Sequence, residues 1–352
     1  RSHPPKPHPF QHSAAAMADE DVSRLADDFA AKVTLHARKV EDTDSEAEED
    51  EETAADEGSM ITGSCKCGGC RFQFPARKVQ PNGPSGKLDM ANCHCSLCRR
   101  AHAAAFASYV TLPTAAVERL KGGDLVHARR DRCKHLNADV LRIFCSKCFS
   151  SLAMLPKVGK EVHVCAGSLE AESLPPVHSF LPWHKEEAPP FLGFVPATKK
   201  EKQKAKQAVA ARGELKVQGG CSCGSCRFVL TRFPEEFQHC YCSSCRKLSG
   251  AAWQTWMPTE EGQLKWTSKV GLKKVRTTSH ARRHVCTKCG VFLTIVYDED
   301  DAVWPLAGAL DDCYTKEDLC LRVSDVSHIC VKYKQPWWTL PNDGLQRIKG
   351  AS

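Results

Sequence analysis

The sequence of 352 residues predicts a mainly β protein built from two tandem copies of one cysteine-rich domain. Three observations predict this fold class. Short alternating or β-branched segments are separated by Gly and Pro, which is typical of strands in small sheets. Several motifs occur twice in the same order, which indicates a duplication. Fourteen of the 21 cysteines fall into patterns with the spacing of metal ligands.

The composition excludes two classes of protein. No apolar run approaches the roughly 20 residues of a membrane-spanning helix, so we expect no membrane partner. No secretory signal opens the chain, and Met17 resembles a translation start, so we expect residues 1–16 to be an extension. We therefore expect a cytoplasmic protein, with the nucleus as the alternative. Thiols stay reduced in both compartments, which favours metal ligands over disulfides.

Residues 1–60 are expected to form an acidic, largely disordered tail. Residues 17–60 carry 16 acidic and 4 basic side chains, whereas the chain from residue 61 onward has a net charge of +17. Residues 41–58 contain no basic residue and predict a solvated linker, with folding back onto the body or mimicry of nucleic acid as alternatives. An amphipathic helix over 20–40, packing on the body or docking a partner, is predicted by the spacing of Val22, Leu25, Phe29, Val33, Ala37 and Val40.

The remainder of the chain repeats itself. Five blocks recur in order: 63–72 as 219–228, 93–99 as 240–246, 144–148 as 285–289, 166–169 as 307–310, and Pro182-Trp183 as Pro336-Trp337. We therefore expect one domain over 61–195 and a second over 217–345. The basic linker between them, 196–216, is rich in helix formers and predicts a solvated helix, with a nuclear-localisation or nucleic-acid patch as the alternative.

The expected strands follow the apolar segments of each copy. In the first copy they cover 71–74, 106–112 and 162–165, and in the second 253–257, 292–297 and 302–304. No long helical periodicity competes with them.

Two cysteine pairs in each copy form a complete set of four thiolates. A C-x-C and a later C-x-x-C each supply two ligands, and four thiolates are typical of a closed, structural zinc site. The free energy of binding such a metal is largely folding free energy. The two sets are Cys65, Cys67, Cys145 and Cys148, and Cys221, Cys223, Cys286 and Cys289.

A third pattern in each copy, C-x-C-x-x-C, supplies only three thiolates. Three protein ligands and a vacant position are typical of a zinc that accepts an exogenous ligand, and zinc deprotonates a coordinated thiol. The alternative is a structural zinc completed by a histidine or another cysteine, and the neighbouring Cys70 and Cys226 complicate the ligand count. The two sets are Cys93, Cys95 and Cys98, and Cys240, Cys242 and Cys245.

Other uses of these cysteines fit less well. A disulfide framework lacks a secretion signal, and a redox dithiol lacks a thioredoxin-like context. Iron–sulfur ligation could use the same thiolates, but the division into four and three fits zinc better. The cysteines without metal spacing are expected to be buried apolar residues: Cys133, Cys165, Cys313, Cys320 and Cys330.

The blocks resemble the family that joins the glutathione-dependent formaldehyde-activating enzyme with centromere protein V. The resemblance covers about 250 residues and rests on the Gly-x-Cys-x-Cys-Gly, Cys-His-Cys-x-x-Cys-Arg, aromatic-Cys-x-x-Cys-Gly and Ala-Gly-x-Leu-Asp motifs. It implies an all-β fold of two or three small sheets arranged like a tent. It also implies two zinc ions per domain, four in total, with a structural role at the four-cysteine sites and a catalytic role at the three-cysteine sites.

Each copy departs from the family pattern at a different place. Phe149 stands where Gly290 keeps the family glycine, and Tyr241 replaces the histidine kept as His94. In the first copy a glutamate, Glu170, replaces the aspartate that the second copy retains. The sequence therefore does not identify which copy is active.

The resemblance implies a carbon–sulfur lyase that condenses glutathione, or a related thiol, with formaldehyde or a similar small carbonyl. Arg99 and Arg246, next to the last cysteine of each open site, are candidates to bind a substrate carboxylate, and His94 is a candidate proton carrier. The alternative is a non-catalytic, zinc-stabilised module that binds chromatin or RNA, which the basic body favours.

Overall fold

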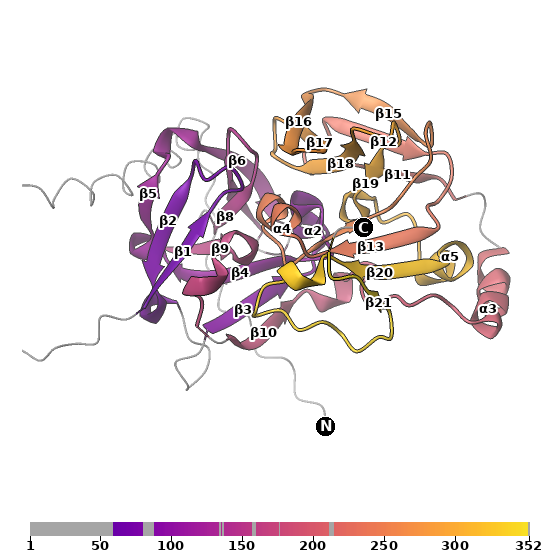
Figure 1. Cartoon of the computed structure of the whole chain (residues 1–352), viewed down its shortest axis with the longest axis horizontal. Helices are drawn as coiled ribbons and strands as arrows, with labels where there is room; N and C mark the ends of the chain where they lie inside the picture. Colours follow the sequence, from indigo (N-terminus) through magenta and orange to yellow (C-terminus); the bar gives the residue numbers. More distant parts are fainter. Residues whose placement is uncertain are drawn as a thin grey trace, which may run out of the picture.

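The computed structural model describes residues 59–79, 88–133, 135, 137–156, 160–175, 177–210 and 215–350. The acidic tail and the helix expected over 20–40 lie outside these residues. The described chain is mainly β, as predicted, and its two copies lie side by side, the first in indigo to magenta and the second in orange to yellow (Figure 1). Among the described residues, no helix has the length and apolar character needed to cross a membrane.

The first copy contains two sheets. A three-stranded antiparallel sheet has the order β1-β2-β5, with β1 (Met60–Ser64), β2 (Arg71–Pro75) and β5 (Glu118–Lys121). A seven-stranded sheet has the order β10-β3-β4-β9-β8-β7-β6, and β10 runs parallel to β3. Its strands are β3 (Leu88–Cys93), β4 (Ala107–Pro113), β6 (Val126–Cys133), β7 (Ala138–Cys145), β8 (Ser151–Pro156), β9 (Glu161–Cys165) and β10 (Val177–Trp183).

The second copy contains three sheets, with the orders β11-β12-β15, β14-β13-β20-β21 and β16-β17-β18-β19. The first comprises β11 (Val217–Gly220), β12 (Cys226–Leu230) and β15 (Leu264–Lys269). The second comprises β13 (Glu236–Cys240), β14 (Gln254–Trp256), β20 (Asp325–Ile329) and β21 (Gln346–Arg347). The third comprises β16 (Leu272–Thr278), β17 (Ala281–Cys286), β18 (Phe292–Tyr297) and β19 (Trp304–Pro305).

The first copy has two sheets and the second has three, in agreement with the tent-like fold. One strand pair accounts for the difference in the number of sheets. In the first copy β4 and β9 pair over five residues, which joins two sheets into one. In the second copy the equivalent strands, β14 and β19, are short, and only an isolated bridge links Trp256 to Leu306. Pro305 in β19 and Pro258 after β14 limit this ladder, because proline has no N–H to donate.

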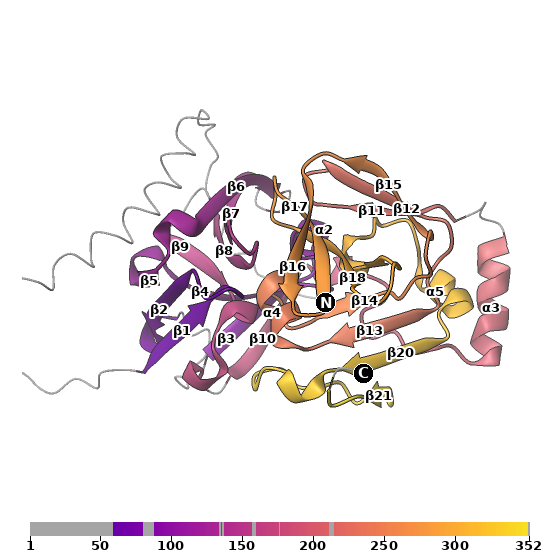
Figure 2. The same cartoon turned by 45° about the horizontal axis from the view of Figure 1, so that its top comes forward.

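The helices are short and lie where the copies meet or at their edges. Helix α2 (Ser96–His102) follows β3, and helix α4 (Ser243–Ser249) follows β13 at the equivalent position. The expected linker helix is present as α3 (Lys199–Ala210), which packs against α5 (Lys316–Arg322) at one end of the molecule (Figures 1 and 2). Only Ala205 of α3 is buried, so the helix remains mostly solvated.

One block of the predicted repeat is wrong. Strand register places Trp183 opposite Cys93 in the first copy and Ile329 opposite Cys240 in the second. Ile329 therefore occupies the place of Trp183, whereas Trp337 lies eight residues beyond it and packs against Phe180. A match of two residues, Pro-Trp, is too short to identify equivalent positions in the two copies. The backbone pairing of the strands identifies them.

The two copies pack reciprocally. Helix α2 contacts the 3₁₀ turn η7 (Ala307–Ala309) of the second copy, and α4 contacts the matching turn η4 (Ala166–Ser168) of the first. The approach is close, because the N–H of Gly167 donates to the carbonyl of Gly250 at 3.0 Å. A Cβ on Gly308 would lie 2.2 Å from the backbone nitrogen of Ala104. The repeated Ala-Gly motif thus serves the contact between copies, as in an isologous dimer interface.

Candidate metal centres

All four predicted cysteine sets are brought together by the fold. In each set the sulfur atoms lie within 4.8 Å of one another, close enough to share a metal ion. In the first copy, the turn after β1 supplies Cys65 and Cys67, the end of β7 supplies Cys145, and the following turn supplies Cys148. The Cys67 thiol lies 3.4 Å from that of Cys65 and 3.9 Å from that of Cys145.

The local turns that hold these thiols are the same in both copies. The N–H of Cys70 donates to the thiol of Cys65 at 3.2 Å, and the N–H of Cys226 donates to the thiol of Cys221 at 3.2 Å. The thiol of Cys70 itself interacts with the carbonyl of Gly122 at 3.8 Å. Cys70 and Cys226 therefore support the clusters but do not belong to the sets of four.

The three-cysteine clusters lie where a strand runs into a short helix. In the first copy Cys93 ends β3, Cys95 caps α2, and Cys98 lies in its first turn. The N–H of Cys98 donates to the Cys95 thiol at 3.4 Å, and Cys245 and Cys242 make the same contact in α4. Backbone donors at a helix start favour thiolates, which are the form that binds metal.

A buried arginine lies against each three-cysteine cluster, and neither arginine was predicted as a site residue. Nη2 of Arg142 lies 3.6 Å from the Cys98 sulfur, and Nη2 of Arg283 lies 3.6 Å from the Cys245 sulfur. A neighbouring guanidinium stabilises a thiolate. A signal was present, because each arginine stands three residues before the first cysteine of a C-x-x-C pair.

The two arginines are held differently. Arg142 donates to Asp131 at 3.0 Å and to the Tyr109 hydroxyl at 3.2 Å. Arg283 lies over the ring of Trp256, 5.4 Å from its centroid, and the Trp256 indole N–H points to the Cys245 sulfur at 3.3 Å. The arginine of the first copy is thus held by ionisable side chains, and the arginine of the second copy lies on an aromatic ring.

A hydrogen-bonded chain leads from the first cluster to the other copy. The Tyr109 hydroxyl lies 3.7 Å from the Cys98 sulfur and 2.9 Å from Nε2 of His102, and Nδ1 of His102 contacts the carbonyl of Ser249 at 2.5 Å. Burial, with the nearby charge of Arg142, lowers the pKa of His102 to about 4. The imidazole is therefore neutral and can donate to Ser249 while it accepts from Tyr109.

Arg99 and Arg246 occupy the interface between the copies. Arg99 is 1% exposed; it donates to the carbonyl of Leu310 at 2.9 Å and pairs with Asp312. Arg246 donates to the carbonyl of Gly167 at 2.8 Å. These guanidinium groups have partners in the opposite copy, a placement that differs from the substrate clamp expected from the sequence.

His94 and Tyr241 occupy equivalent positions with different partners. His94 is buried beside Phe106, with 5.1 Å between ring centroids, and among the described residues its Nδ1 has no hydrogen-bond partner. Burial, together with the charge of Lys185, lowers the pKa of His94. The Tyr241 hydroxyl instead lies 2.9 Å from Nδ1 of His328, whose Nε2 lies 2.9 Å from Asp343.

The two remaining departures from the family pattern have structural explanations. Phe149 adopts a left-handed conformation, with φ of 58°, like Gly290 at 72°, and its ring stacks on Phe144. The carboxylate of Glu170 accepts from Lys247 of the other copy at 2.6 Å, and the equivalent Asp311 lies 3.7 Å from Arg100 of the first copy. The first departure therefore preserves the backbone conformation, and the second preserves an ion pair between the copies.

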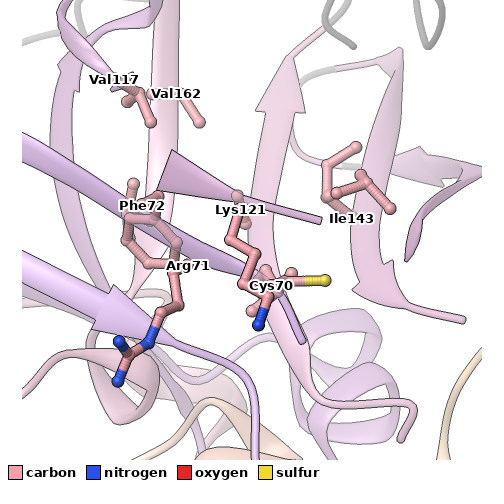
Figure 3. A pocket seen from close by; sticks show the side chains of 11 residues that line it. Cys70, Arg71, Phe72, Val117, Lys121, Ile143 and Val162 are labelled. Atoms are coloured by element: carbon pink, nitrogen blue, oxygen red, sulfur yellow. The ribbon is translucent and has the colours of Figure 1, made fainter. Parts of the chain in front are cut away.

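A separate, largely aliphatic pocket lies inside the first copy (Figure 3). Phe72, Val117, Ile143 and Val162 line it together with Cys70. No cysteine of a three-cysteine cluster lines this pocket, and its lining residues come from both sheets of the first copy.

The fold and its sites define a class: a tandem β protein with one four-thiolate and one three-thiolate cluster in each copy. A model of the glutathione-dependent formaldehyde-activating enzyme family matches residues 60–182 and 216–323. The chain belongs to this family.

One relative carries the name of the family. A protein of Halomonas elongata, named "Putative glutathione-dependent formaldehyde-activating enzyme", is 30% identical over 130 residues, which cover 34% of this chain and 78% of that protein. A crystal structure of a Rhodobacter sphaeroides protein is 19% identical, covers 35% of this chain and 98% of its own, and gives a TM-score of 0.23.

Proposed function

We propose that the protein is a zinc-dependent carbon–sulfur lyase that condenses glutathione with formaldehyde at a three-cysteine site. Family membership supports the reaction class, and the donor sets support the metal. Clusters made only of thiolates suit zinc better than the hard cations, which prefer oxygen ligands.

The four-cysteine clusters are proposed to be structural. Each joins the turn after the first strand of its copy to a turn more than 60 residues further along the chain, as between Cys223 and Cys286. A closed set of four thiolates leaves no position for substrate, so a metal here would contribute folding free energy only.

The proposed reaction forms one bond and moves one proton. The glutathione sulfur bonds to the formaldehyde carbon, the π electrons of the carbonyl move to oxygen, and the proton lost by the thiol ends on that oxygen. Bound zinc would supply the Lewis acidity that lowers the pKa of a substrate thiol.

The residues around the first cluster would stabilise its thiolate ligands and bind the substrate. Arg142 keeps a positive charge beside Cys98 and so supports the thiolate form of the ligands. Nδ1 of His94 has no hydrogen-bond partner among the described residues and is available to a substrate. Arg99 and Arg246 are not assigned to the substrate, because their guanidinium groups are engaged between the copies.

The decisive experiment is exchange NMR of the interconversion of glutathione and S-hydroxymethylglutathione with the zinc-loaded protein. Cys95→Ala and Cys242→Ala are a matched pair, since both residues cap the helix of their cluster. Acceleration above the uncatalysed rate that one substitution removes supports the proposal and identifies the active copy. Background exchange by folded, zinc-loaded protein refutes it.

The alternative of a chromatin- or RNA-binding module has no support in the matches reported above, and we do not propose it. The cytoplasmic location stays a prediction.

A further inference from the structure

We propose that Cys330 is the fourth metal ligand of the second copy's three-cysteine cluster, which makes that cluster a closed, structural site. The first copy then keeps the only cluster, among those in the described residues, with a position for a substrate thiol. This inference rests on the metal occupancy proposed above and specifies the role of each copy.

Strand register identifies the position of Cys330. In the first copy β10 runs parallel to β3 and ends at Trp183, opposite Cys93. In the second copy β20 runs parallel to β13 and ends at Ile329, opposite Cys240. The same backbone bond follows, from His94 N–H to the Trp183 carbonyl at 2.9 Å and from Tyr241 N–H to the Ile329 carbonyl at 3.1 Å. The next residues, His184 and Cys330, are therefore equivalent.

Cys330 lies against the cluster. Its side chain is 5% exposed, and it belongs to the same buried cluster of side chains as Cys240 and Cys245. The sulfur atoms within 4.8 Å of one another are those of Cys240, Cys242 and Cys245, and the backbone bond from Tyr241 to Ile329 brings Cys330 next to this set. A fourth thiolate would reproduce the donor set of the closed clusters.

The backbone at Cys330 is held in an unfavourable conformation. Its φ is 58°, in the left-handed region that favours glycine, and His184 shares this conformation with a φ of 54°. Such residues persist where their surroundings impose the conformation, often at functional sites. The N–H of Cys330 donates to the Gly350 carbonyl at 3.2 Å, and the adjacent Val331 donates to Ile348 at 3.1 Å.

The strand leading to Cys330 is also anchored from the side. His328 lies two residues before Cys330 and is 2% exposed. Its ring bridges the Tyr241 hydroxyl and the Asp343 carboxylate, with both distances 2.9 Å. Because Tyr241 stands between Cys240 and Cys242, this bridge fixes Cys330 relative to the cluster.

The first copy presents a different group at this position. His184 stacks on His135, with 3.5 Å between ring centroids, and its Nδ1 lies 3.7 Å from Glu186. These contacts direct the imidazole toward the β6–β7 hairpin, which carries His135. The fourth position of the first cluster is thus assigned to an exogenous thiol.

The test is a chelator challenge of the full-length, zinc-loaded protein, with released zinc followed by 4-(2-pyridylazo)resorcinol. With four clusters loaded, we expect one zinc to leave rapidly and three slowly in the native protein. Cys330→Ser should give two rapid and two slow zinc ions. Cys320→Ser is the matched control, because Cys320 lies in α5 outside every cluster, and it should release zinc like the native protein. An unchanged release pattern in Cys330→Ser overturns the proposal.

A second measurement needs no variant. Thiols of the native protein are alkylated during gradual zinc removal and identified by mass spectrometry. Cys330 should become reactive in the same step as Cys242, whereas modification of Cys330 while the second cluster retains its metal overturns the proposal. Both experiments measure metal binding and not activity. Their outcome therefore does not depend on whether the protein accelerates glutathione exchange, and the two proposals can fail separately.

Discussion

The buried pair of Arg142 and Asp131 provides a quantitative test of how the first cluster is supported. Both side chains are less than 10% exposed, and Nε of Arg142 donates to Asp131 at 3.0 Å. Arg142→Leu would leave the Asp131 carboxylate buried with two partners, the backbone N–H of Arg132 at 3.1 Å and the guanidinium of Arg129, whose Nη2 lies 3.6 Å away. The same substitution removes the positive charge beside Cys98.

The size of the effect follows from the cost of an unpaired buried charge. Removing one partner of a buried ion pair costs about 3–5 kcal/mol, and we expect about 3 kcal/mol because Arg129 remains beside Asp131. In the second copy, among the described residues, no carboxylate pairs with Arg283. Arg283→Leu should therefore cost about 2 kcal/mol, as for the loss of a hydrogen bond to a charged group.

A double-mutant cycle isolates the pair. Arg142→Leu, Asp131→Asn and the double variant are compared by denaturant unfolding of the zinc-saturated protein. The double variant should be less destabilised than the sum of the single variants by about 1–2 kcal/mol, since the two groups are in contact. Additive single effects would refute the reasoning, because they would show that Asp131 does not depend on Arg142.

Three further outcomes are expected. Removal of metal by a strong chelator should unfold the protein, because a structural zinc contributes roughly 10 kcal/mol of folding free energy; an unchanged circular dichroism melting curve of metal-free protein would contradict this. Gly308→Ala should destabilise the interface by about 1–3 kcal/mol through the clash with Ala104, whereas Gly350→Ala, which meets no atom within 4 Å, should be neutral in the same unfolding assay. Burial alone would raise the pKa of Glu170, but hydrogen bonds from Lys247 and Ser64 outweigh it and lower this pKa. The Glu170 carboxylate therefore stabilises the protein above its unfolded pKa of about 4.3, and this stability is lost as the pH falls through the lower folded value. Glu170→Gln should be less stable than the native protein at pH 7 and equally stable near pH 3, and a difference that does not change with pH would exclude the proposed ion pair.

The metal-ligand cysteines could be predicted from the sequence because their spacing is local. A C-x-C or C-x-x-C pair sits on one tight turn, so the pairing of Cys65 with Cys145 needed only the repeat and a ligand count. Reasoning from adjacency failed for Arg99, because its position next to Cys98 does not say which way the helix faces. The helix turns Arg99 toward the other copy, where it bonds to Leu310.

The sequence by itself determined the duplication, the strand-rich character and the identity of the 14 clustered cysteines, because all three depend on residue type and short-range order. The tertiary structure decided which long-range neighbours reach each cluster. Arg142 reaches Cys98 across 44 residues, and Cys330 is equivalent to His184 only through the parallel pairing of β13 with β20. Contacts of this kind arise from strand register and the packing of one copy on the other, which no local pattern encodes.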